Sequence, residues 1–348
     1  MFNDIEQVYK YKKVLVTGHS GFKGKWLCRI LKKLNCEVFG FSSYKIESSL
    51  FGFDDKSQLV DKEYIGDICT YDLNNLIKKI SPDYIFHFAA QALVKESIRE
   101  PINTFKTNTL GTCLILDALK NLKKRINVVL ITSDKVYKNK EWIWGYRETD
   151  QLGGKDPYSA SKAMAEIGIQ SYLNTYDYLN NGINIAIGRA GNVIGGGDWS
   201  RDRLIPDLIK SIKSKNIIMI RSPKATRPWQ HVLDPLYGYL KLGASLDNDH
   251  SLHGEAFNFG PSNQEARSVE SICYQVKDIF PEVKFKINDI ENCESNLLQL
   301  DCAKSLIRLG FSARFDSYQA VEMTINWYRQ YMNDKTKLKY IIDEQIRS

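Results

Sequence analysis

Short apolar runs alternate with amphipathic segments through the first half of the chain. Apolar runs of strand length occupy residues 14–18, 37–42, 83–90, 126–133 and 183–190. Segments with apolar residues at helical spacing lie between them, at residues 26–34, 72–80, 108–124 and 158–179. Strands that alternate with helices favour right-handed βαβ crossovers and a parallel sheet covered on both faces.

The alternation of apolar runs and amphipathic segments stops after residue 191, where the loop-like stretch GGGDWSRDR (195–203) follows. We predict an α/β fold, a Rossmann-like doubly wound parallel sheet with a smaller α/β substrate-binding C-terminal region. Residues 10–191 form the sheet domain in this prediction, and 230–250 return to it. Residues 192–229 and 251–335 form the substrate-binding region. The site is expected in the cleft beyond the carboxyl ends of the strands.

The composition is that of an ordinary globular enzyme, with 43% hydrophobic and 26% charged residues in 348. No run of about 18 apolar residues appears, so no membrane span is predicted. The first residues, MFNDIEQVYKYKK, include acidic side chains and lack the apolar stretch of a secretory signal. We therefore expect a cytoplasmic protein.

The formal charge of +7 is spread along the chain and is not concentrated in a tail or block. A basic surface around an anionic small-molecule pocket accounts for it, and we predict no nucleic-acid partner. Seven cysteines occur without a CxxC or a Cys/His cluster. We expect them to be reduced and mostly buried, and we expect no metal site.

A glycine-rich turn, Thr17 to Gly24, stands between the first predicted strand and the first predicted helix. Its sequence TGHSGFKG has glycines at GxxGxxG spacing. Such glycines permit a tight turn and let a pyrophosphate approach the N–H groups at the helix N-terminus. The position in a βαβ unit favours a dinucleotide site, and the alternative is a strand-to-helix turn without a ligand.

The second strand lacks the carboxylate that usually recognises a ribose. Phe41, Ser42 and Ser43 stand at its end. An acid there accepts the ribose 2′-hydroxyl and favours NAD over NADP, so its absence leaves the choice between the two cofactors open. Asp67, after the third strand, is either an adenine contact or a plain turn aspartate.

A second constellation combines Ser133, at the end of the predicted strand 126–133, with Tyr158 and Lys162. The YxxxK spacing puts the tyrosine and the lysine one turn apart on one helix face. A nearby ammonium favours phenolate and is expected to lower the tyrosine pKa. The tyrosine then becomes a candidate base for a hydroxyl group.

Motifs throughout the chain resemble those of one enzyme family. They are TGHSGFKG, GDI, FHFAAQ, TN..GT, TSDK, YSASK and RAGNVIGGGDW. The chain is identified through them as similar to the extended short-chain dehydrogenase/reductase family, over residues 12–328. TGHSGFKGKWL, TSDKVY, EWIWGYRETDQLGGKDPYSASK and RPWQHVLDP resemble more specifically its nucleotide-sugar 4,6-dehydratases.

The resemblance implies a cofactor, a substrate class and a set of site residues. The cofactor is NAD, held by the domain at 10–191, and the partner is a nucleotide sugar. The implied catalytic residues are Ser133, Asp134, Lys135, Tyr158 and Lys162. The implied cofactor-binding residues are Gly18, Ser20, Gly21, Phe22, Lys23, Gly24, Asp67, Ile68, Ala89, Ala90, Asn108, Thr132, Tyr158 and Lys162. The implied substrate-binding residues are Gln91, Asn192, Arg227 and His231.

Two of the substrate-side assignments keep an alternative. Arg227 resembles the family arginine that clamps the substrate diphosphate, a task that suits a guanidinium fork, but a surface arginine is the alternative. His231 is as readily a structural histidine as a nucleotide contact. The amphipathic segments 101–123 and 158–179 resemble those that pair family members into a homodimer or a higher homo-oligomer.

The implied reaction is an internally redox-neutral dehydration. Tyr158 removes the C4 hydroxyl proton, and Asp134 later protonates the departing C6 hydroxyl. Related dehydratases carry Asp-Glu at this place, whereas this chain has Asp134-Lys135. A lysine with an ordinary pKa of about 10.4 is a poor base at neutral pH. Lys135 is therefore either the C5 base, with a lowered pKa, or a group that orients substrate or stabilises the enolate.

Two other functions fit the same residues less well. A sugar-nucleotide 4-epimerase or 4-ketoreductase would use Tyr158 and Lys162 but would not need Asp134 and Lys135. A non-enzymatic cofactor-binding module would not need Ser133, Tyr158 and Lys162 together. The sequence therefore favours the dehydratase.

Overall fold

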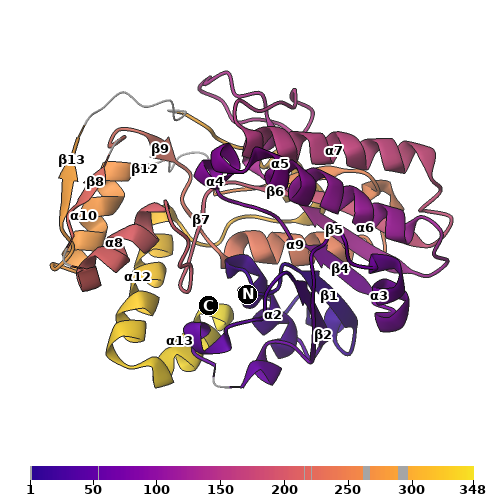
Figure 1. Ribbon diagram of the computed structural model, residues 1–348, viewed down its shortest axis with the longest axis horizontal. Coiled ribbons are helices and arrows are strands. Elements are labelled where there is room, and N and C mark those ends of the chain that lie inside the picture. The colour runs from indigo at the N-terminus through magenta and orange to yellow at the C-terminus, as the bar shows by residue number, and fades with distance from the viewer. Residues whose placement is uncertain (1, 54, 215, 221, 262–266, 289–296) are drawn as a thin grey trace.

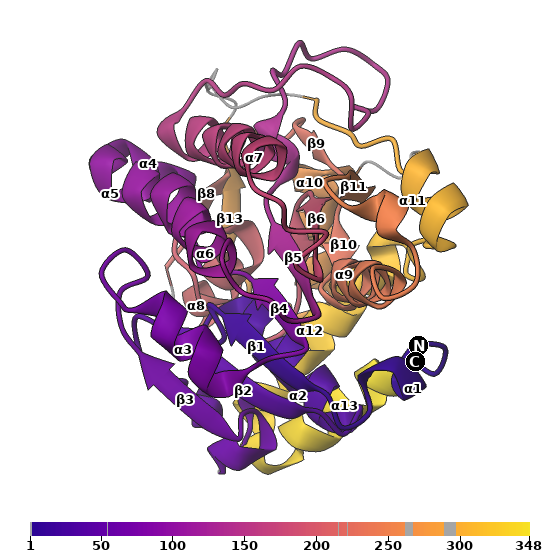
Figure 2. The same cartoon turned by 90° about the vertical axis from the view of Figure 1, so that its right-hand side faces the viewer.

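The computed structural model describes residues 2–53, 55–214, 216–220, 222–261, 267–288 and 297–348. At its centre lies a seven-stranded parallel sheet with the order β11-β6-β5-β4-β1-β2-β3 (Figures 1 and 2). The strands are β1 (Lys13–Thr17), β2 (Glu37–Ser42), β3 (Lys62–Ile65), β4 (Tyr84–His87), β5 (Ile126–Ile131), β6 (Ile183–Ala190) and β11 (Ala256–Phe259). The order 3-2-1-4-5-6 is that of a doubly wound sheet, so the predicted fold class is confirmed.

Helices cover both faces of this sheet. Figure 2 shows α3, α6 and α7 on one side, and α2 and α9 on the other. Alternate side chains of one strand enter the two cores: Val14 and Val16 pack on the side of Trp26, whereas Leu15 packs on the side of Ile115. The covering helices are α2 (Phe22–Lys33), α3 (Leu73–Ile80), α4 (Val94–Arg99), α5 (Pro101–Phe105), α6 (Gly111–Leu119), α7 (Pro157–Thr175) and α9 (Leu233–Ser245).

Local signals fix where the long helix α7 begins. The Asp156 side chain caps it by accepting a hydrogen bond from the Ser159 N–H at 3.0 Å, and Pro157 occupies the first turn. The helix ends at Thr175, four residues before the predicted end, because Tyr176 is extended. This start aligns Tyr158 and Lys162 at the carboxyl edge of the sheet.

The smaller region is assembled from short strand pairs and helices, at the left of Figure 1. Its pairs are β7 (Val193–Ile194) with β10 (Gln230–His231), β8 (Ile218–Ile220) with β13 (Phe285–Ile287), and β9 (Thr226–Arg227) with β12 (Arg267–Ser268). Helices here are α8 (Leu204–Ser214), α10 (Val269–Ile279) and α12 (Ser317–Asn333). The remaining helices are α1 (Glu6–Tyr9), α11 (Ala303–Leu309) and α13 (Leu338–Arg347).

The structure differs from the predicted domain limits at one strand. β11 lies within 251–335, yet it pairs with β6 as the edge strand of the main sheet. The strand β11 is only four residues long, which is too short a pattern to reveal this pairing. The pairing also depends on a partner far away in the sequence. Helix α9, from the segment 230–250, packs against β5 and β6.

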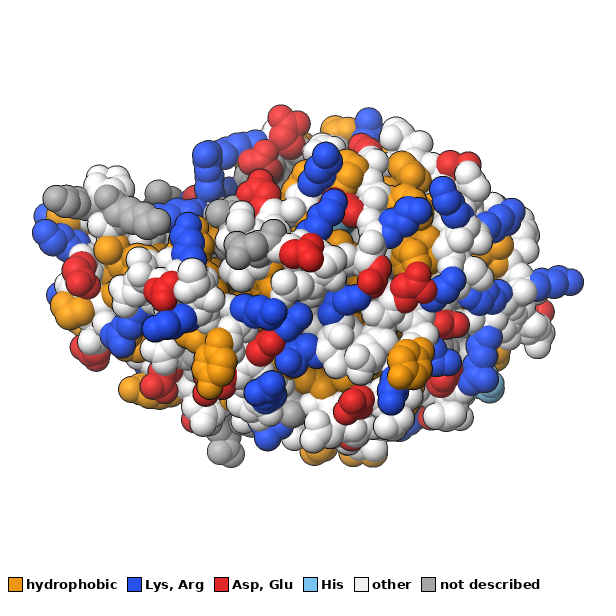
Figure 3. Space-filling view, turned by 90° about the horizontal axis from the view of Figure 1, so that it is seen from below, with side chains coloured by type: hydrophobic (Ala, Val, Ile, Leu, Met, Phe, Trp, Pro, Cys, Tyr) orange, Lys and Arg blue, Asp and Glu red, His pale blue; other side chains and the backbone are white. Residues whose placement is uncertain are grey.

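The surface and the cysteines add three observations. On the face in Figure 3, basic and acidic side chains are interspersed and do not form single-sign blocks. Within the described residues, no helix has both the length and the apolar character needed to cross a bilayer. The described cysteines are all free thiols: Cys28, Cys36, Cys69, Cys113, Cys273 and Cys302. Cys293 lies outside the described residues.

Candidate active site

The glycine-rich turn forms a narrow cradle at the N-terminus of α2. Gly18 has a φ of +73°, and a Cβ added to it would lie 2.7 Å from the Ala89 nitrogen. A Cβ on Gly24 would lie 2.3 Å from the Gly18 carbonyl oxygen, so neither site accepts a side chain. Gly21 caps the helix. Ser20 Oγ is buried without a hydrogen-bond partner among the described residues, as expected of a group that awaits a ligand.

The next residue of the cradle, Lys23, belongs to the catalytic centre as well as to the turn. Burial lowers the pKa of its ammonium to about 7, and the cations Arg203 and Lys162 act in the same direction. Asp134 and Asp198 oppose this shift. Its electrostatic neighbours therefore come from the end of β5, from α7 and from the loop after β7.

The two acids near β3, Glu63 and Asp67, both accept hydrogen bonds from the protein. Asp67 is exposed and accepts a hydrogen bond from the Cys69 N–H at 2.8 Å, which is a turn contact, while Ile68 is buried. Glu63 Oε1 lies 3.0 Å from His19 Nε2 and also accepts the Ile46 N–H. These bonds engage Glu63 behind the turn, so it does not replace the acid missing from β2.

The segment after β4 is held by Asn108. Ala89, Ala90 and Gln91 are half-buried there. Asn108 is fully buried, accepts the Gln91 N–H at 2.8 Å, and donates to the Gln91 carbonyl and to Ser161 Oγ, each at 2.9 Å. The structure therefore differs from the prediction that Asn108 contacts the cofactor, because its polar atoms are all engaged in shaping this segment.

The predicted catalytic residues meet where β5 ends and the short helix η4 (Asp134–Val136) begins. Ser133 Oγ donates to Asp134 Oδ1 at 2.9 Å and accepts the Lys135 N–H at 3.2 Å. Ser133 and Asp134 also act on the pKa of Tyr158, so both lie close to its hydroxyl. Lys135 is half-buried beside them. The side chains of Ser133, Asp134 and Tyr158 are thus gathered at one place.

The electrostatics of the tyrosine differ from the sequence expectation. Burial raises the pKa of the Tyr158 hydroxyl, and the hydrogen bond with Ser133 only opposes that rise. The expected lowering by Lys162 is not the dominant effect, because Lys162 Nζ donates to the Ile131 carbonyl at 3.2 Å. Burial also lowers the pKa of Lys162 to about 8, and Glu166 acts against that change.

The four predicted substrate residues lie in different settings. Asn192 and Arg227 are half-buried, Asn192 directly before β7 and Arg227 on β9. The Gln91 amide folds back onto the Leu93 carbonyl and Thr104 Oγ1. His231 is fully buried, which favours its structural alternative, and its role as a substrate contact stays a prediction.

The buried position of His231 has a clear physical basis. Its ring packs edge-on against Trp26 and Phe315, with ring centroids 5.9 and 5.8 Å away. Burial lowers its pKa to about 3, so the ring is neutral at physiological pH. An apolar, enclosed position of this kind does not present the imidazole to a nucleotide.

Two cations of the small region were not predicted. Arg203, in the loop after β7, pairs with Asp198 at 3.1 Å and lowers the pKa of Tyr158, so it lies close to the catalytic centre. Arg267 is the cross-strand neighbour of Arg227 in the β9–β12 pair. The available signal was a loop rich in arginine beside GGGDW, but only the strand pairing reveals Arg267.

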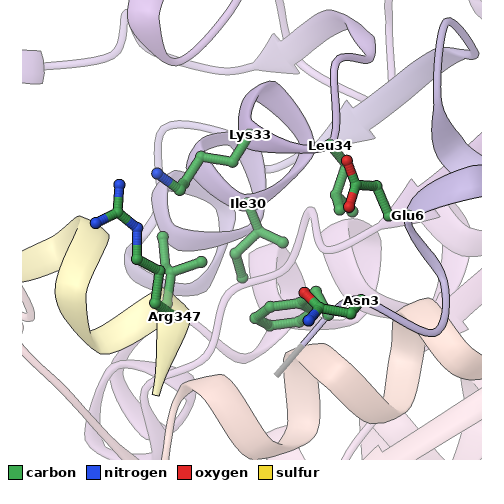
Figure 4. A pocket seen from close by; sticks show the side chains of 8 residues that line it. Asn3, Glu6, Ile30, Lys33, Leu34 and Arg347 are labelled. Atoms are coloured by element: carbon green, nitrogen blue, oxygen red, sulfur yellow. The ribbon is translucent and has the colours of Figure 1, made fainter.

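Two other features of the described residues bear on the site. No group of three or more His, Cys, Asp or Glu side chains in the described ranges has the arrangement of a metal site. A cavity between α1, α2 and α13, drawn in Figure 4, is lined by Phe2, Asn3, Glu6, Ile30, Lys33, Leu34, Ile346 and Arg347. It contains none of the predicted site residues and lies beside the two termini (Figure 1).

Known proteins resemble this chain over most of its length. The model of the "NAD dependent epimerase/dehydratase family" matches residues 14–260. A CDP-glucose 4,6-dehydratase of Salmonella typhimurium is 39% identical over 94% of this chain and 93% of its own. A UDP-glucose 4-epimerase of Mycoplasma pneumoniae is 26% identical over 92% of this chain and 98% of its own.

Solved structures share the fold. An epimerase from Methanothermobacter thermautotrophicus superposes with a TM-score of 0.81 and 21% identity, covering 97% of this chain and 98% of its own. A UDP-glucuronic acid 4-epimerase from Bacillus cereus, in complex with UDP-glucuronic acid and NAD, gives a TM-score of 0.78 and 23% identity. That superposition covers 92% of this chain and 99% of the epimerase chain.

Proposed function

Because the chain belongs to the NAD-dependent epimerase/dehydratase family, we propose that it dehydrates CDP-glucose to CDP-4-keto-6-deoxyglucose. The observation that carries the proposal is the group of Ser133, Asp134 and Tyr158, in which Ser133 Oγ is hydrogen-bonded to Asp134 and lies close to the tyrosine. A second proton donor stands beside the tyrosine, and elimination of water requires such a donor, whereas epimerisation at C4 does not. The 39% identity to a CDP-glucose 4,6-dehydratase supports the same reaction.

The residues of the cradle fit a dinucleotide. Gly18 and Gly24 leave space that a Cβ would fill, and the buried Ser20 hydroxyl lacks a protein partner among the described residues. The N–H groups of Phe22 and Lys23 lie in the first turn of α2, and a helix N-terminus favours a diphosphate. When bound, NAD supplies a reversible two-electron acceptor, so that the reaction as a whole needs no external oxidant.

The first step uses the groups between β5 and α7. Tyr158 takes the proton from the C4 hydroxyl, and Ser133 orients the tyrosine by the hydrogen bond between them. The buried ammonium of Lys162 favours the phenolate form. C4 becomes a ketone, which acidifies the proton on C5.

The second step uses the residues of η4. A base removes the C5 proton, and Asp134 donates a proton to the C6 hydroxyl as it departs as water. The two electrons taken from C4 then return to C6 as a hydride, and the base gives its proton back to C5, which completes the 6-deoxy sugar. Lys135 is our candidate for the C5 base, and Lys23 is a second amine in reach of the same centre, with its pKa lowered to about 7. The alternative for Lys135 is to stabilise the enolate that forms at C4.

Substrate recognition is assigned to the small region. We assign the diphosphate contacts to Arg227 and Asn192, because a guanidinium fork and an amide suit phosphate oxygens. The segments GGGDW and RPWQHVLDP, which carry these residues or adjoin them, resemble CDP-glucose 4,6-dehydratases in particular. In this proposal the cofactor binds the sheet domain, and substrate binds between that domain and the loops of 192–229 and 251–335.

We further propose a homodimer that works in the cytoplasm. Ile98, Ile102 and Ile167, on α4, α5 and α7, are 60% or more exposed on neighbouring helices (Figures 1 and 2). Exposed isoleucines on adjacent helices favour pairing with a second copy. The free thiols fit a reducing compartment. Light scattering tests the dimer: Ile102→Asp with Ile167→Asp should give monomers, and an unchanged mass would contradict this interface.

The test of the function is the product of purified enzyme with catalytic NAD. CDP-glucose, UDP-glucose, dTDP-glucose and GDP-mannose are offered separately, and the product masses are measured. Loss of one water from CDP-glucose, faster than from the others, is expected. A product of unchanged mass would instead identify a 4-epimerase, and preference for another base would change the substrate but not the chemistry. Asp134→Asn is the matched control, because it removes the proton donor at constant size.

A further inference from the structure

A buried ion pair lies directly beneath the catalytic groups and has no part in the mechanism above. Arg189, on β6, donates from Nε to both carboxylate oxygens of Glu166, on α7, at 2.9 and 3.1 Å. The two side chains are 4% and 2% exposed. A buried pair of charges is costly to desolvate and gives weak evidence of stabilisation, so another role deserves consideration.

The carboxylate also contacts the strand that carries the catalytic residues. Thr132 Oγ1 donates to Glu166 Oε1 at 2.6 Å. Lys162, one turn earlier on α7, donates to the carbonyl of Ile131 at 3.2 Å. Glu166 and Lys162 therefore hold two successive residues, the last of β5 and the one that follows it, immediately before Ser133.

We propose that Glu166 is a positioning residue of the catalytic centre, whose carboxylate acts on Lys162 from one turn away on α7 and fixes, through Thr132, the chain between β5 and Ser133. The role rests on the proposed function, since it acts through Lys162 and Tyr158. Glu166 contacts neither substrate nor cofactor in this proposal. It acts through Lys162 and Tyr158, which do.

Glu166 is the charged side chain that raises the pKa of Lys162, against the larger effect of burial, and Arg189 on β6 is the cation paired with it. Lys23, on α2, is a second cation that acts against it, and His87, on β4, is neutral because burial and Lys162 lower its pKa to about 3. Asp134, on η4, acts on Lys23 and Tyr158. The charged side chains of the other elements packed on α7 are wholly or partly exposed: Lys95, Glu96, Arg99, Lys106 and Asp117.

The far side of the arginine provides a matched control. Arg189 Nη1 donates to the Tyr137 hydroxyl at 2.7 Å, and that hydroxyl donates to Asn258 Oδ1 at 2.7 Å. Tyr137→Phe removes a buried hydrogen bond from the same guanidinium but leaves the carboxylate in place. A purely structural ion pair predicts that Tyr137→Phe and Glu166→Gln have similar consequences.

The decisive measurement is an NMR titration of the ligand-free enzyme with ¹³C-labelled lysine side chains. The Lys162 signal is assigned by its loss in Lys162→Met. Glu166→Gln should lower its titration midpoint by about one to three pH units, the usual effect of removing a close opposite charge. Tyr137→Phe should leave the midpoint unchanged while lowering the melting temperature. Equal midpoints in wild type and Glu166→Gln would overturn the proposal.

Two further variants keep the test decisive. If Glu166→Gln does not fold, Glu166→Gln with Arg189→Gln removes the pair without leaving a buried charge, and the midpoint should still fall. Lys23→Met removes an amine that is mostly uncharged where Lys162 titrates and should leave the midpoint nearly unchanged, and a fall as large as in Glu166→Gln would contradict the assignment. No substrate is needed for these titrations, so they can succeed or fail independently of the dehydratase reaction. In active enzyme, the alkaline limb of kcat/KM should move to lower pH in Glu166→Gln.

Discussion

The two regions that meet at the site are built in different ways. On the catalytic side, β5 and β6 are six and eight residues long and every residue in them is buried. On the substrate side, the strands β9 and β12 have two residues each and are half-buried. The first region holds its side chains by buried hydrogen bonds, whereas the second presents arginines from short strands and loops.

This difference separates chemistry from recognition. Proton transfers require groups held within hydrogen-bond reach, and the network from Ser133 to Arg189 provides that rigidity. A nucleotide sugar with two phosphates requires cations that can adapt to it, which loops carrying Arg203 and Arg227 can offer. Changes on the first side should therefore affect turnover, and changes on the second should affect binding.

The largest effect is expected at Tyr158. Tyr158→Phe deletes only the hydroxyl, so the protein should fold while kcat falls by about 10² to 10⁴-fold, the range of general acid–base catalysis. KM for CDP-glucose should change little. Steady-state kinetics with circular dichroism as a folding control measures this. An unchanged kcat would remove Tyr158 from the mechanism and end the division between the two regions.

The next effect distinguishes two amines of the catalytic side. If Lys135 is the C5 base, Lys135→Met should prevent solvent deuterium from entering C5 and should stop formation of 6-deoxy product. Lys23→Met is the comparison variant, since its amine, with a pKa lowered to about 7, is the competing base. Mass spectrometry of the product formed in heavy water measures the deuterium at C5 for both variants. Near-normal incorporation in Lys135→Met, with loss in Lys23→Met, would transfer the role to Lys23.

A smaller and different effect is expected on the substrate side. Arg227→Ala should raise KM by about ten-fold or more with kcat nearly retained, because hydrogen bonds to charged groups contribute about 1.5 to 3 kcal/mol. Arg267→Ala, at its cross-strand neighbour, tests whether the pair acts together. A defect confined to kcat would show that Arg227 belongs to the catalytic side.

The smallest effect on activity is expected at Asp234, on α9, where the chain returns from the small region. Burial raises the pKa of Asp234 to about 7, although the Arg314 N–H opposes the rise. In the unfolded chain an aspartate titrates near about 3.9, so the stability associated with Asp234 is present below that pH and is lost as the pH rises to about 7.

Asp234→Asn removes this loss while preserving the acceptor for Arg314. The variant should match wild type near pH 4 and exceed its free energy of unfolding by roughly 2 kcal/mol at pH 8, with activity unchanged. Urea unfolding at several pH values measures the difference. A variant less stable than wild type at pH 8 would contradict a buried Asp234 with a raised pKa.

The catalytic side was largely predictable because its signals are local. The strand-helix alternation gave the sheet, the glycine spacing gave the cradle of Gly18 to Gly24, and the YxxxK spacing brought Tyr158 to Ser133. Burial was the part that local pattern could not supply. It reverses the expected direction of the Tyr158 pKa, encloses His231 and directs Asn108 inward.

The substrate side was less predictable because it depends on pairings between distant residues. Arg267 meets Arg227 only through the β9–β12 pair, and β11 joins the main sheet beside β6, about 70 residues earlier. Glu166 was missed for a similar reason. Its role follows from Arg189 and Thr132, which are separated from it by 23 and 34 residues.

The central claim, a dehydration with internal return of the electrons taken from C4, is tested most directly with CDP-glucose deuterated at C4. With NAD at a small fraction of the substrate concentration, every molecule should still be converted. The product should have lost one water and should carry the deuterium at C6. Conversion limited to the amount of NAD, or product without deuterium at C6, would contradict the account.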